Sequence, residues 1–270
     1  MERFKDLKNK VVVISGAAGL LAEDLIEQLL LNNAVVYGID INKNIIKTQY
    51  KILKLKFPKS KFELKVCDIT KENQVKKTIK DIIKKSKKID ILVNNAATKT
   101  KNLKNFFNLF QNYRLSDWKE IMDVNLNGSF LLSREVARFM IKKKSGNIIS
   151  IASIQGVVGN DKNLYKNSKF KGVKMNSPAV YSASKSALIG LTRYLATYLG
   201  EYNIRANSIS PGGVKSNQNN NFVNNYSKKV PLKRMGNKRE IINCILFLSS
   251  EKSSYINGQN IIIDGGYTAW

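Results

Sequence analysis

Runs of apolar, β-branched residues alternate with longer amphipathic segments along the chain, and this alternation constrains the fold most strongly. The first run, residues 10–15, is followed by a Gly/Ala turn and by a helix-like segment over residues 20–31. Later runs cover residues 35–39, 62–67, 89–93, 147–151, 205–209 and 260–263. The pattern predicts an α/β fold in which helices cover both faces of a parallel sheet.

The length of the chain and its lack of histidine narrow the possible classes of protein. A chain of 270 residues without internal repeats or a low-complexity linker is most simply one domain. The chain contains no histidine, which excludes Ser-His-Asp catalysis and any His-ligated metal site. Cys67 and Cys244 lie far apart without ligand spacing. We therefore expect no metal site, and two buried thiols in a reducing cytoplasm.

The net charge of +26 raises the question of nucleic acid or membrane binding. Only eight of the 46 basic residues are Arg, and the lysines are scattered in short clusters. This distribution favours solvated faces over a nucleic-acid surface, although it would attract phosphorylated or nucleotide-linked substrates. No segment approaches the roughly 20 apolar residues of a membrane span, and residues 1–10 lack an apolar signal core. We expect a cytoplasmic protein without a membrane partner.

The first apolar run ends in a turn that suits a dinucleotide. Gly16 permits a tight turn and Gly19 a close backbone approach, where pyrophosphate meets helix N-terminal amides. Asp40 follows the second run and suits a carboxylate that binds the adenosine ribose diol and repels a 2′-phosphate. NAD is therefore expected rather than NADP, although Lys43 beside Asn42 offers a phosphate partner.

Tyr181 and Lys185 lie four residues apart at the start of a segment with helical apolar spacing, so they share one helix face. A phenol has a pKa near ~10, and a neighbouring ammonium favours its phenolate form. Without histidine, this pair is the natural acid–base device. The residues alone are equally compatible with a half-buried Tyr and a solvated Lys.

The ordered motifs resemble the classical short-chain dehydrogenase/reductase family over residues 7–270. Besides the glycine turn and Tyr181/Lys185, they are Cys67-Asp68-Ile69-Thr70, Asn94-Asn95-Ala96-Ala97, Asn125 within Asp123–Gly128, Ser153 after residues 148–152, Ser210-Pro211-Gly212-Gly213-Val214, and Asp264-Gly265-Gly266. The resemblance implies a single-domain Rossmann fold, a doubly wound sheet of about seven strands. It also implies the cofactor contacts Ser15, Gly16, Gly19, Leu20, Leu21, Asp40, Ile41, Asp68, Ile69, Asn95, Ala96, Ala97, Tyr181, Lys185, Pro211, Gly212 and Val214.

The same resemblance implies the catalytic roles. Tyr181 exchanges a proton with the substrate oxygen, and Lys185 lowers the pKa of the tyrosine and holds the nicotinamide ribose. Ser153 positions the substrate oxygen, and Asn125 supports a water relay to Lys185. Paired helices over residues 118–140 and 180–199 are the family's usual oligomer faces, so the resemblance implies a homodimer or homotetramer.

The chain departs from the family pattern in three places. Leu20 and Ala22 stand where the family usually has glycines, and Val214 is followed by Lys-Ser where a Thr is common. The gap from Ser153 to Tyr181 is about twice the usual length. The additional residues, 156–177, have no helical or strand period, and we expect them to form a loop over the substrate pocket.

The C-terminal third resembles the flagellin-modification, surface-glycan oxidoreductases in four segments, residues 194–198, 210–214, 231–235 and 264–270. This resemblance implies a small-molecule substrate, an anionic sugar phosphate or nucleotide sugar. One alternative is a 3-oxoacyl-carrier-protein reductase, whose acidic carrier suits a basic surface. An alternative from another class is a non-catalytic dinucleotide-binding sensor or assembly protein.

Overall fold

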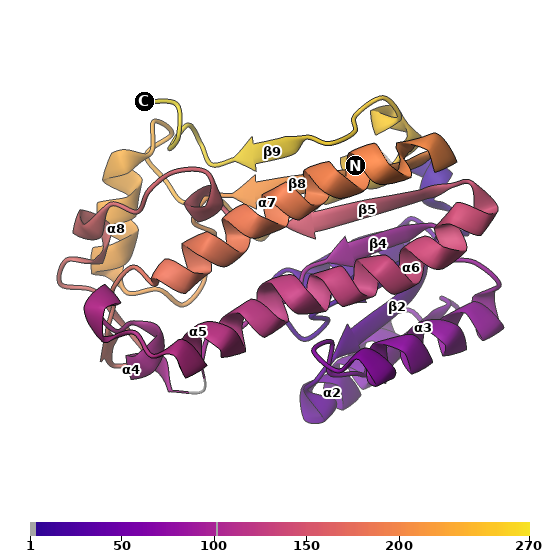
Figure 1. Ribbon diagram of the computed structural model, residues 1–270, viewed down its shortest axis with the longest axis horizontal. Coiled ribbons are helices and arrows are strands. Elements are labelled where there is room, and N and C mark those ends of the chain that lie inside the picture. The colour runs from indigo at the N-terminus through magenta and orange to yellow at the C-terminus, as the bar shows by residue number, and fades with distance from the viewer. Residues whose placement is uncertain (1–3, 101) are drawn as a thin grey trace.

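A computed structural model describes residues 4–100 and 102–270, and its centre is one parallel sheet (Figure 1). The seven strands lie in the order β3-β2-β1-β4-β5-β8-β9. Their bounds are β1 Val11–Ser15, β2 Val35–Asp40, β3 Phe62–Val66, β4 Ile91–Asn94, β5 Gly146–Ile151, β8 Ile204–Pro211 and β9 Asn260–Ile263. The sequence prediction of a doubly wound, Rossmann-type α/β fold is confirmed, with strand ends shifted by one or two residues.

Helices cover both faces of the sheet, because successive residues of each strand point to opposite sides. Val12 of β1 packs with α1, α2 and α9, whereas Val11 and Val13 pack with α3, α6 and α7. Helices α3, α6 and α7 lie in front of the sheet in Figure 1. The bounds are α1 Ala22–Leu31, α2 Lys43–Lys56, α3 Glu72–Ser86, α4 Leu103–Phe106, α5 Leu115–Met122, α6 Ser129–Lys143, α7 Ala179–Leu199, α8 Asn220–Lys229 and α9 Lys238–Ser249.

The strand order reverses at β1, which pairs with β2 on one side and β4 on the other. In an open α/β sheet, ligands bind outside the carboxyl ends of the strands at such a switch point. The predicted site segments follow the carboxyl ends of β1, β2, β3, β4, β5 and β8. The fold therefore brings the predicted site segments together at the carboxyl ends of the strands.

Three expectations about local structure need correction. The first helix begins at Ala22 rather than at residue 20, so Leu20 and Leu21 remain in the turn. The segment over residues 118–140 is not one regular helix, because a π-helical stretch, Asp123–Gly128, separates α5 from α6. Residues 156–177 are not structureless: they hold a 3₁₀ turn, Lys162–Tyr165, and the hairpin β6 Lys169–Phe170 and β7 Val173–Lys174.

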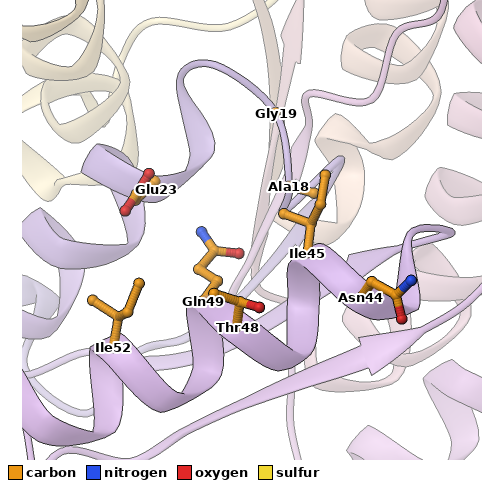
Figure 2. A pocket seen from close by; sticks show the side chains of 8 residues that line it. All are labelled: Ala18, Gly19, Glu23, Asn44, Ile45, Thr48, Gln49 and Ile52. Carbon is orange, nitrogen blue, oxygen red and sulfur yellow. The ribbon is translucent and has the colours of Figure 1, made fainter.

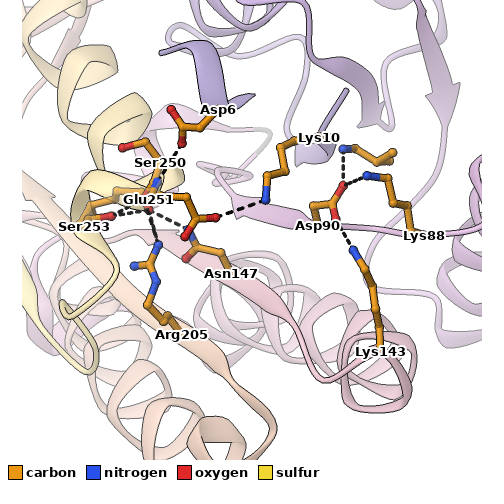
Figure 3. Close-up of polar contacts among 12 residues, drawn as sticks. Asp6, Lys10, Lys88, Asp90, Lys143, Asn147, Arg205, Ser250, Glu251 and Ser253 are labelled. Atoms are coloured by element: carbon orange, nitrogen blue, oxygen red, sulfur yellow. Dashed lines mark hydrogen bonds and ion pairs between the residues drawn. The ribbon is translucent and has the colours of Figure 1, made fainter. Parts of the chain in front are cut away.

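At the amino-terminal ends of the strands, the buried carboxylate of Asp90 connects β4 to its neighbours (Figure 3). One oxygen accepts from Val11 N at 2.8 Å and contacts Lys88 Nζ at 2.8 Å, and the other pairs with Lys143 Nζ. Burial alone raises the pKa of Asp90, but the two lysines and the Val11 amide lower it to below its ordinary value.

Asp90→Asn should therefore destabilise the protein by about 1–3 kcal/mol at neutral pH. Because the folded-state pKa of Asp90 lies below the unfolded value of about 3.9, the ionised carboxylate stabilises the fold above that pH. This stabilisation is lost as the pH falls through the folded-state pKa. Urea unfolding at pH 7, 5 and 3 should show the difference between the two proteins shrinking only at the lowest pH. A difference independent of pH would show that the ion pairs contribute nothing.

Within the part of the chain that the structure describes, no helix is long and apolar enough to span a membrane. The same residues bring together no cluster of three or more metal-ligating side chains. The segment over residues 1–10, where we expect no signal core, lies partly outside the described residues.

Candidate active site

The glycine turn is built around Gly16, whose φ of +67° is a conformation that favours glycine. A Cβ at Gly16 would lie 2.7 Å from Ala96 Cα, so the turn and the segment after β4 touch. The buried Ser15 hydroxyl accepts from Asn95 N and Ala96 N, both at 3.1 Å. The structure thus brings together these predicted cofactor residues from β1 and β4.

The turn presents unpaired amides at the start of α1. Gly19 N donates to Gly16 O at 2.9 Å, and Ala22 N donates to Gly19 O at 3.1 Å. Among the described residues, neither Leu20 N nor Leu21 N donates to a protein acceptor. Backbone amides at a helix N-terminus attract anions, so this turn fits the pyrophosphate of a dinucleotide.

Asp40, at the end of β2, lies beside the turn. Its two oxygens accept from Ala18 N at 3.0 Å and from Asn42 N at 2.9 Å. Ile41 follows it and is 65% exposed. The carboxylate is thus held in a fixed orientation at the edge where the resemblance places the adenosine ribose.

A cavity of about 380 Å³ opens next to Ala18, between α1 and α2 (Figure 2). Glu23 faces it from α1, and Thr48 and Gln49 face it from α2. The buried Gln49 Oε1 has no hydrogen-bond partner among the described residues. Sequence analysis missed this cavity, because apart from Ala18 and Gly19 of the turn its lining comes from α1 and α2, which share no motif. No basic side chain lines it within the described residues.

The predicted adenine segment follows β3. Asp68 Oδ1 accepts from both the amide and the hydroxyl of Thr70, which fixes the carboxylate. The Ile69 side chain is buried and packs against Gly128, where a Cβ would lie 2.6 Å from it. Asp68 is therefore available to a ligand, whereas the Ile69 side chain supports the core. Ala97 is exposed at the end of the neighbouring segment.

Tyr181 and Lys185 lie on one face of α7, as the spacing predicts. Lys185 Nζ lies 5.7 Å from the centroid of the Tyr181 ring and donates to Ile151 O at 2.6 Å. Lys185 is only 3% exposed, so it is not the solvated lysine of the alternative interpretation. The carbonyl at the end of β5 thus anchors the ammonium beneath the tyrosine.

The pKa values of the pair follow from their burial. Burial raises the pKa of Tyr181, and a hydrogen bond with Ser153 offsets this only in part. Burial also lowers the pKa of Lys185 to about 8. In the free protein desolvation is the largest influence on the Tyr181 pKa, so the lowering of this pKa by Lys185 stays a prediction.

Ser153 and Asn125 complete the predicted set. The Ser153 hydroxyl accepts from Gln155 N at 3.2 Å, and it lies near enough to the Tyr181 phenol to influence its pKa. Asn125 is fully buried within the π-helical stretch; its Oδ1 accepts from Thr98 N at 2.9 Å, and its Nδ2 donates to Ser184 Oγ at 3.1 Å. A π-helical turn is uncommon and is frequent at functional sites.

Gly156 is a residue of the site that sequence analysis did not find. A Cβ there would lie 2.7–2.9 Å from backbone atoms of Lys185 and Ser186. Ser186 Oγ also donates to Gly156 O at 2.9 Å. The turn that carries Ser153 therefore packs directly on the helix that carries the Tyr181/Lys185 pair.

The segment after β8 closes the site from the other side. Pro211 is the last residue of β8, and Gly212 N donates to Ile263 O at 2.8 Å. Gly213 N donates to the Tyr226 hydroxyl at 2.6 Å, which connects this segment to α8. Val214 pairs with Gly236 in an isolated bridge.

The insertion over residues 156–177 is joined to the site by a polar network. The Asn160 amide donates to Gln155 Oε1 at 3.3 Å, to Ser182 Oγ at 3.1 Å and to Ser177 Oγ. Gln155 in turn donates to the Tyr165 hydroxyl at 2.8 Å. These contacts place the insertion beside the residues that follow Ser153 and Tyr181.

The insertion also packs on α8. The side-chain amides of α8 and its N-cap donate to main-chain carbonyls of the insertion: Asn219 to Lys169, Asn221 to Asn167 and Asn225 to Lys166. Lys229 forms an ion pair with Asp161 at 2.7 Å. The insertion and α8 therefore form one substructure at this end of the sheet.

Comparisons with known proteins agree with this arrangement. A family model described as enoyl-(acyl carrier protein) reductase matches residues 16–268. The 3-oxoacyl-acyl-carrier-protein reductase FabG of Buchnera aphidicola subsp. Schizaphis graminum is 34% identical over 264 residues, which cover 96% of this chain and 98% of the relative. The post-translational flagellin modification protein A of Campylobacter coli is 31% identical over 264 residues, with coverage of 97% and 99%.

Among solved structures, the crystal structure of a short-chain dehydrogenase from Leptospira borgpetersenii serovar Hardjo-bovis with bound NAD⁺ superposes with a TM-score of 0.85. It is 34% identical in sequence, and the match covers 99% of this chain and 96% of the other. Together with the sheet order and the full-length sequence matches, this places the chain in the short-chain dehydrogenase/reductase family of oxidoreductases.

Proposed function

We propose that this protein is an NAD(H)-dependent oxidoreductase that interconverts a secondary alcohol and a ketone. The observation that carries the proposal is the buried Lys185 ammonium held below Tyr181, with Ser153 near enough to the phenol to influence its pKa. A bound nicotinamide dinucleotide supplies or accepts the hydride. A redox sensor or assembly protein without catalysis has no use for this buried set.

Each side chain has a role in the proposed reaction. The raised pKa of Tyr181 keeps its phenol protonated at neutral pH, so it can donate a proton to the ketone oxygen in reduction. The Ser153 hydroxyl orients that oxygen by a second hydrogen bond. Lys185 restores the proton to the phenol, and Asn125 keeps the adjoining segment in place through its bond to Thr98 N.

The support for NAD over NADP comes from the charges around the predicted ribose site. Asp40 is fixed there by two backbone amides, and the cavity beyond Ala18 contains the carboxylate of Glu23 without a basic lining residue in the described chain. A 2′-phosphate would meet two carboxylates, which is unfavourable at short range.

A fluorescence titration should therefore give a Kd for NADH at least about tenfold lower than for NADPH. Asp40→Asn removes the charge but keeps a carbonyl acceptor, so the preference should narrow to about threefold or less, mainly through tighter NADPH binding. Glu27→Gln, a carboxylate of α1 that pairs with Lys56 and lies outside the cavity lining, is the control. Equal affinity for both cofactors in the wild type would contradict the assignment.

We further propose an anionic sugar derivative, a sugar phosphate or nucleotide sugar of surface-glycan synthesis, as the substrate. The polar network around Asn160 supports a hydroxyl-rich ligand, and the similarity to the flagellin modification protein supports the pathway. Mass spectrometry of material released from the purified protein should detect a phosphorylated sugar. A released acyl thioester would contradict this substrate class.

Reduction of a 3-oxoacyl carrier is the second candidate, favoured by the identity of 34% to a reductase of that name. Steady-state assays with acetoacetyl-coenzyme A and either NADH or NADPH discriminate the two. Turnover with NADPH at a kcat/KM above about 10⁴ M⁻¹s⁻¹ would favour the carrier substrate.

We also propose a homodimer or homotetramer assembled through α6 and α7. Phe130 on α6 and the stacked Tyr194 and Tyr198 on α7 are large apolar or aromatic side chains between 44% and 59% exposed. Such residues are enriched in interfaces between subunits. Light scattering gives the mass directly, and a monomer at micromolar concentration would contradict this assembly.

A further inference from the structure

The segment after β4 carries a lysine beside the buried Asn125. Thr98 N donates to Asn125 Oδ1 at 2.9 Å, and the Thr98 hydroxyl donates to Lys99 O at 2.9 Å. Lys99 therefore directly follows Thr98, the residue whose amide Asn125 binds. Its position follows from the same contacts that organise the proposed catalytic set.

The hairpin of the insertion lies over this segment. Phe170 and Val173 pair across the hairpin, and both pack in the apolar cluster that Tyr181 also contacts. Their neighbours Lys169 and Lys174 are exposed, on the opposite face of the two strands. The face with Phe170 is thus turned toward the proposed site, and Lys171 stands at the tip with a φ of +47°.

Lys99 Nζ lies 4.2 Å from the centroid of the Phe170 ring, the shortest cation–π contact within the described residues. The aromatic face orients the ammonium while leaving its remaining donors available. Within residues 4–100 and 102–270, neither Lys99 nor Lys171 forms an ion pair with a carboxylate.

Lys171 directly follows Phe170, whose ring the Lys99 ammonium contacts, so the two lysines extend from the same end of the hairpin. Lys99 is exposed as a whole, but partial desolvation of its ammonium lowers its pKa, and the charge of Lys171 lowers it further. Like charges that converge without a carboxylate between them are stabilised by an anion from outside the chain. A phosphate group offers several acceptor oxygens to such a pair.

We propose that Lys99 and Lys171 bind a phosphate group of the substrate while its carbinol or ketone carbon lies at Tyr181. This assignment rests on the proposed function and names the residues that would recognise the anionic part of the substrate. The hairpin then contributes to specificity through charge, and Phe170 holds Lys99 in position.

The test measures binding of inorganic pyrophosphate to protein saturated with NAD⁺, so that the cofactor's own pyrophosphate site is filled. Calorimetry should detect binding that weakens as salt rises from 50 to 300 mM. Lys99→Gln and Lys171→Asn should each raise the Kd about fivefold or more, and the double variant further. Asn suits the positive φ of position 171, so the turn is kept.

Lys174→Gln is the matched control, because it removes an equal charge from the other face of the same hairpin. It should bind pyrophosphate within about twofold of the wild type, and thermal unfolding should show all four variants folded. No binding to the wild type would overturn the assignment. Equal binding by the wild type and the double variant, or an equal loss in Lys174→Gln, would do the same.

Competition identifies the source of the phosphate and separates this site from the reaction. Displacement of pyrophosphate by glucose 1-phosphate supports a sugar phosphate, whereas displacement only by 4′-phosphopantetheine would overturn the sugar assignment in favour of an acyl carrier. NADH-dependent reduction of neutral ketones without pyrophosphate binding would leave the proposed reaction intact and remove the anion site. Pyrophosphate binding without any turnover would do the reverse.

Discussion

Tyr181→Phe should lower kcat by about a thousandfold or more while the Kd for NADH stays within about twofold of the wild type. The substitution removes only the phenolic hydroxyl, and the ring can keep its packing against the apolar cluster near the hairpin. Single-turnover reduction with NADH, followed by its absorbance, separates this loss from cofactor binding.

The control is Tyr255→Phe, which removes a hydroxyl from a fully exposed position away from the site and should leave kcat unchanged. If Tyr181→Phe retained turnover within about tenfold of the wild type, another group would have to carry the proton. If it lost NADH binding as well, the tyrosine would serve the cofactor rather than the substrate.

Gly156→Ala should lower kcat by about a hundredfold without unfolding the protein. The new methyl group would meet backbone atoms of Lys185 and Ser186 at 2.7–2.9 Å, and backbone cannot rotate away as a side chain can. The turn carrying Ser153 must then move relative to Tyr181, and displacements of about 1 Å in an active site can cost two orders of magnitude in rate.

Gly159→Ala is the comparison, because a Cβ there meets no atom within 4 Å. It adds the same methyl group three residues farther along and should leave both kcat and the thermal midpoint unchanged. Circular dichroism should show Gly156→Ala folded, with a midpoint lowered by a few degrees. Full activity in Gly156→Ala would mean that the contact with α7 has no part in positioning Ser153.

The sequence was sufficient to predict the strands of the sheet, because each is a short apolar run bounded by turn residues. Their parallel arrangement follows from the helices between them. It also placed the Tyr181/Lys185 pair, since helical spacing fixes which residues share a face. The family resemblance added Ser153 and Asn125, whose residue types alone indicate nothing.

Features that depend on contacts between distant segments could not be predicted from the sequence. Gly156 has no left-handed φ to mark it, and its importance lies in the distance to α7. The Lys99–Phe170 contact joins residues 71 positions apart, and lysine is too common here for one to stand out. The hairpin was missed because two-residue strands are too short to show a period.

The way in which the insertion is attached bears on how such a protein can diversify. Asn219, Asn221 and Asn225 donate to main-chain carbonyls, and every residue type supplies that acceptor. Mutations can therefore exchange the exposed side chains of the insertion while these main-chain contacts with α8 persist. Selection can thus alter ligand preference in this segment while the machinery at Tyr181 and Lys185 remains constant.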